Sequence, residues 1–140
     1  RTVGNTGCGP IAMYNMFKDI NQWESLPDII SIMEINEMNS DGGGTRTEMI
    51  SHILNGFNVQ YSYCTYDNYK KRYKNKTARF VISIQFNDKG YGHLIYVVKK
   101  KNKVCIYNAF NETNKPLEYK VLSMYAEESN AYVSNIYVIE

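Results

Sequence analysis

The 140 residues give room for one domain with one hydrophobic core. A hydrophobic content of 44% with 21% charged residues is typical of a folded globular protein and argues against disorder. The net charge of +2 is too small to favour nucleic acid or an anionic membrane as the main partner. No apolar run is long enough to span a bilayer.

The chain begins with Arg1 and has no charged-then-apolar signal segment at its start. We therefore expect a processed form or a domain excised from a longer polypeptide, in a cytoplasmic or a secreted setting. The three cysteines, Cys8, Cys64 and Cys105, are an odd number without CxxC or Cys/His metal spacing. They favour neither a disulfide framework nor a zinc site, and we expect no metal and no cofactor.

Helical patterns fill residues 1–56. Apolar periodicity predicts a helix over about 8–21 and a less regular one over about 23–37. Three successive glycines at 42–44 predict a loop over 39–44, because glycine loses much backbone entropy inside an element. Thr45 and Glu48 form a capping box for a third helix, which contains His52 as a surface or packing residue and ends near Gly56.

From residue 57 the apolar period changes from that of a helix to that of a strand. The strand candidates are residues 58–66, 79–86, 93–99, 103–110, 119–124 and 132–139. Short polar connectors join them, so the strands are expected to be antiparallel. Helices first and antiparallel strands second predict an α+β fold in one domain, residues 1–140.

Cys8 stands in the segment NTGCGP, residues 5–10, directly before the first apolar-periodic run. Pro10 fits only the first turn of a helix, so the helix should begin at about Cys8 or Gly9. The positive end of the helix dipole and the free N–H groups favour a thiolate there, which makes Cys8 a candidate nucleophile. A buried capping cysteine is the alternative. Cys64 and Cys105 lie in strand patterns and are expected to be buried small hydrophobes.

His93 follows the segment GYG and begins a strand, so it is placed to act as a base for the thiol. A hairpin turn through Lys100 and Lys101 would place Asn108 directly opposite His93. Asn108 could then accept from the imidazole Nδ1–H and fix its tautomer. A turn through Lys101 and Asn102 would instead place Asn108 opposite Ile95, on the same face but one pair further along. Cys, His and Asn are the three parts of a thiol catalytic set.

With these motifs the chain resembles the papain-like cysteine peptidases, most closely the compact bacterial peptidases that cleave double-glycine leaders from bacteriocin precursors. The resemblance rests on residues 6–13 (TGCGPIAM), on residues 92–98 (GHLIYVV) and on Asn108, and it follows nearly the whole chain in element order. It implies a papain-like fold, in which the helix bearing the cysteine lies against the end of an antiparallel sheet bearing the histidine.

The resemblance implies that Cys8 is the nucleophile, His93 the general base and then acid, and Asn108 the residue that orients His93. The leader peptidases usually have Asp in the third position, whereas Asn is the choice of papain. The family also places an oxyanion-hole glutamine shortly before the cysteine, and residues 1–7 contain none. Either Asn5 takes that role, or the donor lies upstream of Arg1, or the domain is catalytically impaired.

The glycines Gly42, Gly43 and Gly44 lie where papain-like folds place a glycine-rich segment that binds substrate main chain. Side-chain-free backbone would let an extended peptide approach, and a plain connector is the alternative. The expected partner is a peptide or protein substrate, hydrolysed through a thioester acyl-enzyme, with a leader or another small-residue-containing peptide preferred. The alternatives are a catalytically impaired peptidase-fold domain that binds a peptide or a partner protein, and a cell-wall peptide amidase or endopeptidase.

Two basic segments are expected to be solvated surface rather than functional. Residues 69–76 (YKKRYKNK) interleave tyrosines with basic residues, as nucleic-acid-binding patches do, but the small net charge argues for an exposed face. Lys99, Lys100, Lys101 and Lys103 are typical of an exposed hairpin tip.

Overall fold

The structure is a computed structural model that describes residues 50–90, 92–107 and 116–140, together with positions 12, 15–16, 18–19, 39–40 and 44–45. Positions 12, 15–16 and 18–19 are helical, within the predicted first helix. The elements with defined bounds are β1 (Asn39–Ser40), β2 (Gly44–Thr45), α4 (Ile50–Gly56), β3 (Tyr61–Cys64), α5 (Tyr66–Arg72), β4 (Ala78–Phe86), β5 (Gly92–Lys100), β6 (Lys103–Tyr107), β7 (Leu117–Tyr119), α6 (Leu122–Glu128) and β8 (Ala131–Ile139).

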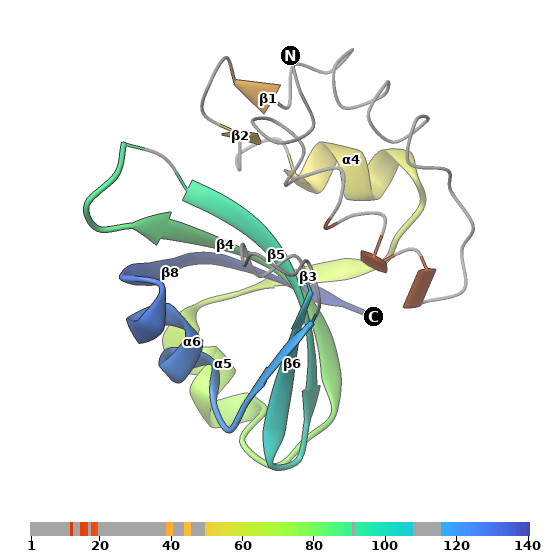
Figure 1. Ribbon diagram of the computed structural model, residues 1–140. Coiled ribbons are helices and arrows are strands. Elements are labelled where there is room, and N and C mark those ends of the chain that lie inside the picture. The colour runs from red at the N-terminus through yellow and green to blue at the C-terminus, as the bar shows by residue number, and fades with distance from the viewer. Residues whose placement is uncertain are drawn as a thin grey trace.

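An open antiparallel sheet of six strands organises the described part of the chain, in the order β3-β8-β4-β5-β6-β7 (Figure 1). The final strand, β8, lies between β3 and β4, so the C-terminal segment is built into the sheet interior. The α+β class and the antiparallel sheet predicted from the sequence are confirmed. Most residues before position 50 lie outside the described residues, and so does most of the predicted papain-like arrangement of the N-terminal helices.

The two central strands are buried on both faces, which explains their nearly continuous apolar sequences. Phe80, Ile82 and Ile84 point to one face of β4, as predicted from alternation, and Val81 points to the other. These two faces support two separate hydrophobic clusters. The strands β4, β5 and β8 were placed correctly by the sequence pattern to within about two residues.

Helices cover the sheet on opposite sides. The first cluster joins Ala12, Met16 and the α4 residues Ile50 and Leu54 to the face that presents Tyr96. The second cluster packs the remaining two helices against the opposite face, through Tyr69 of α5 and through Leu122 and Tyr125 of α6. Figure 1 shows α5 and α6 on one side of the sheet and the positions of the first helix, in red, on the other.

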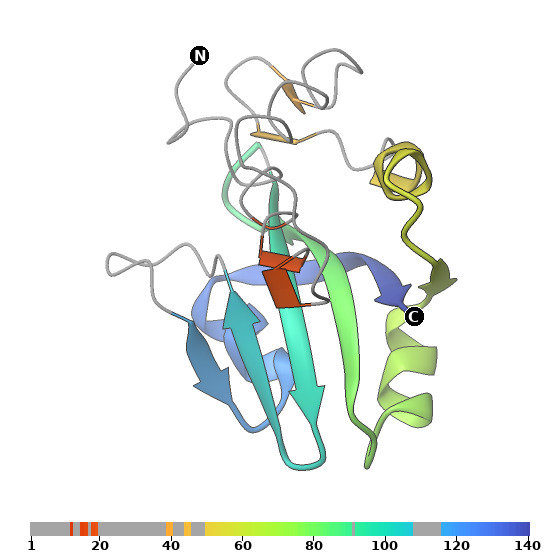
Figure 2. The same ribbon diagram turned by 90° about the vertical axis from the view of Figure 1, so that its right-hand side faces the viewer.

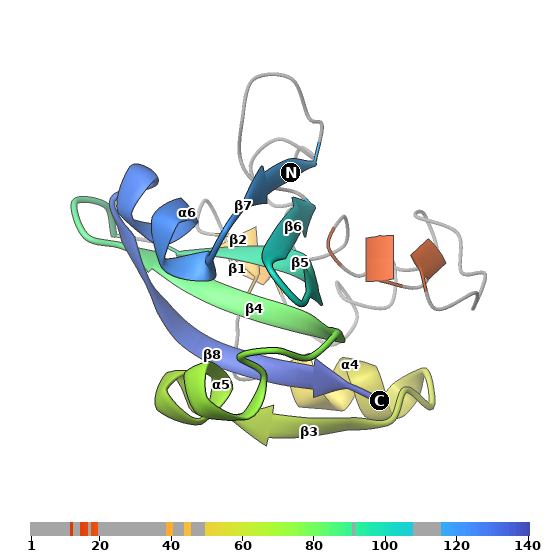
Figure 3. The same ribbon diagram turned by 90° about the horizontal axis from the view of Figure 1, so that it is seen from below.

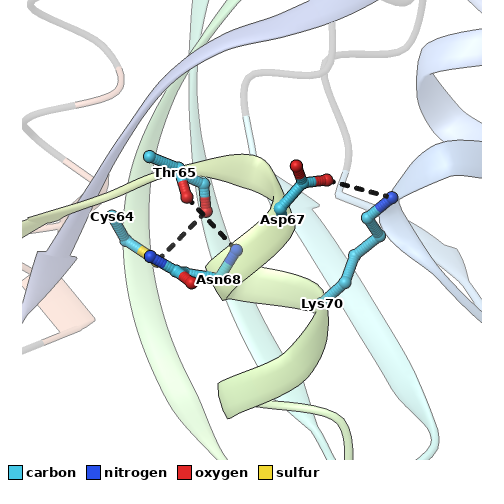
Figure 4. A network of polar contacts seen from close by, with 5 residues as sticks. All are labelled: Cys64, Thr65, Asp67, Asn68 and Lys70. Atoms are coloured by element: carbon cyan, nitrogen blue, oxygen red, sulfur yellow. Dashed lines mark hydrogen bonds and ion pairs between the residues drawn. The ribbon is translucent and has the colours of Figure 1, made fainter.

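Helix α5 corrects the sequence prediction, which continued a strand to residue 66. The basic run at 69–76 is largely exposed, as predicted, and its first part lies in this helix. Thr65 caps the helix, because its Oγ1 accepts from the Asn68 N–H at 3.2 Å (Figure 4). Asp67 lies in the first turn and pairs with Lys70 at 3.7 Å. An acidic first turn and a basic last turn complement the helix dipole, so a local signal for α5 was present.

Two further predictions are wrong. Residues 119–124 were expected to form a strand, but β7 ends at Tyr119 and α6 begins at Leu122. The buried residues of α6 recur at helical spacing, and this periodicity extends beyond the six residues that suggested a strand. The loop predicted over 39–44 is interrupted by the short pair β1–β2, in which Ser40 faces Gly44.

Helix α4 ends at Gly56 as predicted, although the left-handed residue that turns the chain is Asn58, with φ of 60°. The Val59 N–H then donates to the Leu54 carbonyl at 2.8 Å. Thr45 lies in β2, and Glu48, the other residue of the predicted capping box, lies outside the described residues. The helix predicted over 23–37 lies outside them as well.

Candidate functional site

His93 occupies the second position of β5, at the end of a central strand. It is 6% exposed and pairs across the sheet with Ile84, whose side chain belongs to the cluster beneath α5 and α6. Directly opposed residues share a face, so the imidazole lies on that face as well. The Phe86 ring lies beside it, with 6.4 Å between ring centroids. The histidine is therefore held by packing at a strand end, as the sequence predicted for its backbone position.

Gly92, the residue before His93, occupies a position without room for a side chain. A Cβ there would lie against the carbonyl oxygen of Ile84 and 3.2 Å from the Gln85 Oε1. The requirement concerns space between two central strands rather than an unusual backbone conformation. The absence of a side chain lets β4 and β5 stay paired up to this point, and so it fixes the backbone that positions His93.

The register of the β5–β6 hairpin decides how the next strand lies relative to His93. Lys100 faces Lys103 and Tyr96 faces Tyr107, so the turn runs through Lys101 and Asn102. The turn through Lys100 and Lys101, which would have placed Asn108 opposite His93, is not formed. The two registers differ by two residues, so every side chain stays on the same face in both. The turn therefore determines the register, and Asn102 is a better turn former than Lys100. Asn108 itself lies outside the described residues.

One of the predicted substrate-binding glycines, Gly44, belongs to a strand that contacts the histidine strand. Gly44 belongs to β2, and β2 contacts β5. The structure thus brings one of the three predicted substrate-binding glycines next to the strand of His93. Gly42 and Gly43 lie outside the described residues, and so do Cys8 and Asn5.

Asp19 joins the first helix to the sheet, a role that the sequence did not indicate. Its Oδ2 accepts from the Tyr96 hydroxyl at 2.5 Å and from the Arg79 Nε at 2.7 Å. Tyr96 is fully buried, and burial, followed by the bond to Asp19, raises the pKa of its phenol. These partners are 60 and 77 positions apart in sequence, so no local pattern could have found them.

Of the two described cysteines, Cys64 is buried as predicted, whereas Cys105 is only half-buried, contrary to the prediction. Cys64 is 3% exposed and its Sγ donates to the Thr65 carbonyl at 3.2 Å, as Figure 4 shows. Burial raises the pKa of its thiol, and the Arg72 charge offsets this only in part. Cys105 is half-buried in β6, beside Tyr107. Neither thiol forms a disulfide among the described residues.

Comparisons of the chain with protein-family models and with curated protein sequences gave no match. Within the described ranges, no helix is long and apolar enough to cross a bilayer. The same residues contain no group of three His, Cys, Asp or Glu side chains that could hold a metal ion.

Proposed function

We propose that the protein is a cysteine peptidase that uses Cys8, His93 and Asn108. The observation on which this rests is the position of His93, which is buried at the end of a central strand of an antiparallel sheet. The short strand β2, which contains Gly44, contacts the strand of His93. That position agrees with the arrangement that the resemblance to papain-like peptidases implies. The sequence around Cys8 supplies the nucleophile.

The anchoring of the first helix supports an approach of Cys8 to His93. From Asp19, bonded to Tyr96, a helix reaching back to Cys8 would span about 16 Å. The part of β5 from Tyr96 back to Gly92 spans about 13 Å. A helix running alongside β5 with its start toward Gly92 would therefore bring Cys8 to the end of the strand.

Cys8 would have to approach His93 past the end of β5, because the described positions of the first helix and His93 lie on opposite faces of the sheet. Ala12 and Met16 pack on the face opposite to His93, so the thiol has to meet the imidazole beyond Gly92 rather than across the sheet. In Figure 2 the red positions of the first helix lie alongside the middle of the sheet, over β5. The close backbone packing at Gly92 leaves the end of β5 unobstructed by a side chain on the residue before His93.

The chemistry follows from these roles. The Cys8 thiolate attacks the scissile carbonyl carbon, and the protonated imidazole of His93 gives its proton to the leaving amine. A water molecule, deprotonated by His93, then attacks the thioester and releases the acid and the thiol. In the observed register we expect Asn108 opposite Ile95 and diagonal to His93, where its amide can orient the ring.

A catalytically impaired peptide-binding domain is the second candidate, favoured by the absence of glutamine from residues 1–7. One missing oxyanion donor removes roughly 3 kcal/mol of transition-state stabilisation, about a hundredfold in rate. Asn5 is the residue that would supply the donor in the active form. Turnover by the wild-type chain that falls about a hundredfold in Asn5→Ala supports the peptidase with Asn5 as donor, whereas peptide binding without turnover supports the impaired domain.

The decisive experiment is thiol labelling with iodoacetamide at pH 7, followed residue by residue by mass spectrometry. Cys8 should label at least tenfold faster than Cys64, whose raised pKa and burial keep it a thiol. His93→Ala should slow the labelling of Cys8 and leave Cys64 unchanged. If Cys8 labels no faster than the two described cysteines, or if Cys8→Ala leaves peptide hydrolysis intact, the peptidase proposal fails.

A further inference from the structure

Two basic segments that look separate in the sequence meet at one pocket. The run at 69–76 forms the end of α5 and the turn after it, and Lys99, Lys101 and Asn102 belong to the β5–β6 hairpin. Both segments line a pocket of about 610 Å³ together with the start of α6. Figure 3, which looks at the molecule from below, shows α5, α6 and the β5–β6 hairpin around the same end of the sheet.

The rim of this pocket is rich in positive charge. Its lysines are Lys70, Lys74, Lys99, Lys101 and Lys120, and no acidic residue is among the lining side chains. Lys70 pairs with Asp67 at 3.7 Å. Among the described residues, Lys74, Lys101 and Lys120 make no ion pair. Three exposed ammonium groups around one opening repel one another and attract an anion.

Lys99 is buried and connects two walls of the pocket through hydrogen bonds. It is 9% exposed, and its Nζ donates to the carbonyls of Lys74 at 3.3 Å, Lys76 at 3.4 Å and Lys100 at 3.2 Å. These bonds tie the turn after α5 to the hairpin and so fix two walls of the pocket. Within the described part of the chain its partners are neutral carbonyls and no carboxylate pairs with its ammonium group. Burial lowers the pKa of this lysine.

The floor of the pocket is apolar. Val104 and Leu122 are buried beneath it, and Val121 is 51% exposed at its edge. The Tyr66 ring already has two neighbours, the Lys70 Nζ 4.8 Å from its centre and the stacked Tyr69 ring at 6.0 Å, and they compete with a nucleobase for stacking on it. The volume lies within the range of sites for small organic ligands.

We propose that this lysine pocket, defined by Lys74, Lys99, Lys101, Lys120 and Val121, binds a small soluble phosphorylated compound with an apolar portion. Two or more negative charges on a phosphate or diphosphate match the unpaired lysines, whereas a single carboxylate would balance only one. The apolar portion would lie on Val104, Val121 and Leu122.

The lysine pocket is distinct from the peptidase site. Lys99 and His93 lie on the same strand, six positions apart, which corresponds to about 20 Å along the strand. The side chains of Ile95 and Val97 fill the face between them and are fully buried. Ligand binding in the pocket can therefore be measured without reference to peptide hydrolysis.

Titration calorimetry of the whole chain at low salt tests the proposal, with inorganic pyrophosphate and hexyl diphosphate as probes. We expect both to bind, and hexyl diphosphate to bind about tenfold more tightly because its alkyl chain covers apolar surface. Lys74→Gln and Lys120→Gln should each weaken pyrophosphate binding about tenfold, and 0.3 M NaCl should weaken it further. These lysines are exposed, so the variants should remain folded.

Two variants serve as controls. Lys71→Gln removes one positive charge from α5, three positions before Lys74 and outside the pocket lining, and should change affinity less than twofold. Val121→Ser should abolish the advantage of hexyl diphosphate and leave pyrophosphate binding unchanged. Equal losses in Lys71→Gln and Lys120→Gln, no heat at millimolar probe, or binding only to vesicles containing phosphatidic acid would each overturn the proposal.

Discussion

A methyl group added at Gly92 is the sharpest single perturbation that the structure offers. The new Cβ would lie against the Ile84 carbonyl oxygen, 3.2 Å from the Gln85 Oε1 and 3.4 Å from the Ile84 carbonyl carbon. The Ile84 carbonyl cannot yield easily, because β4 is paired on both sides, with β5 and with β8. Relief therefore requires the central strands to separate near His93.

Overpacking of this kind destabilises a protein by about 1–3 kcal/mol, and a clash with fixed backbone belongs at the upper end of that range. We expect Gly92→Ala to lower the free energy of unfolding by about 3 kcal/mol and the melting temperature by roughly 10 °C. Urea unfolding followed by tyrosine and tryptophan fluorescence measures the change. The slope with urea should stay the same if only stability has changed.

Gly90→Ala is the matched control, because a Cβ at Gly90 meets nothing within 4 Å. It should change the free energy of unfolding by less than about 0.5 kcal/mol. If the two alanine variants are equally stable, the close approach of β4 and β5 at Gly92 does not exist as described. Peptidase activity of folded Gly92→Ala should fall as well, since the displaced strand end is the one that positions His93.

Three more predictions follow from buried or capping groups. Asp19→Ala leaves the buried Tyr96 hydroxyl without its acceptor and should lower the free energy of unfolding, measured in urea, by about 1–3 kcal/mol. Adding Tyr96→Phe to that variant should recover part of the loss. A double variant no more stable than Asp19→Ala would refute the bond. Val121 is the extended N-cap of α6 and makes no side-chain hydrogen bond to the helix, whereas a serine hydroxyl could accept one from a first-turn N–H. Val121→Ser should therefore raise the free energy of unfolding by about 1 kcal/mol. An unchanged melting temperature would contradict this. Burial raises the pKa of Tyr125 to about 12 from 10.0, so the unfolded chain loses this proton first and the free energy of unfolding should fall from pH 10 to 12. Tyr125→Phe should reduce that fall by up to about 1.4 kcal/mol per pH unit. An unchanged slope would contradict the burial effect.

The sheet could be predicted largely from local sequence, because its strands are long and their alternation has a physical cause. Val81 and Ile82 face different clusters, so each position of β4 is fixed by burial on one side or the other. The short helices could not be found in the same way. Seven residues of α5 and seven of α6 hold few periods, and both helices depend on contacts with the sheet.

The candidate site was predictable only in part, for two physical reasons. A two-residue shift of a hairpin leaves every side chain on its face, so alternation could not decide the partner of His93. The turn decided it, through the pairing of Lys100 with Lys103. The anchoring of the first helix by Asp19 depends on partners in β4 and β5, which only the folded chain brings together.

The lysine pocket, like the candidate site, could not be predicted from local sequence. Residues 69–76 and the hairpin lysines each have the composition of a solvated surface, and most of their side chains are indeed exposed. Their meeting depends on Lys99, a lysine buried at a strand position where alternation places an inward side chain. A charged residue at such a position in an otherwise apolar strand is the one sequence signal that could have indicated the pocket.

The two ends of β5 can be tested for independence through stability alone. Gly92 lies at one end of the strand, and Val121 lines the lysine pocket together with Lys99, which lies about 20 Å further along β5. Substitutions so far apart without shared contacts add to within about 0.5 kcal/mol. The double variant Gly92→Ala, Val121→Ser should therefore be about 2 kcal/mol less stable than the wild-type chain. A larger deviation from additivity would mean that β5 and α6 transmit strain from the histidine end of the sheet to the lysine pocket, and hence that a ligand in the pocket could alter the position of His93.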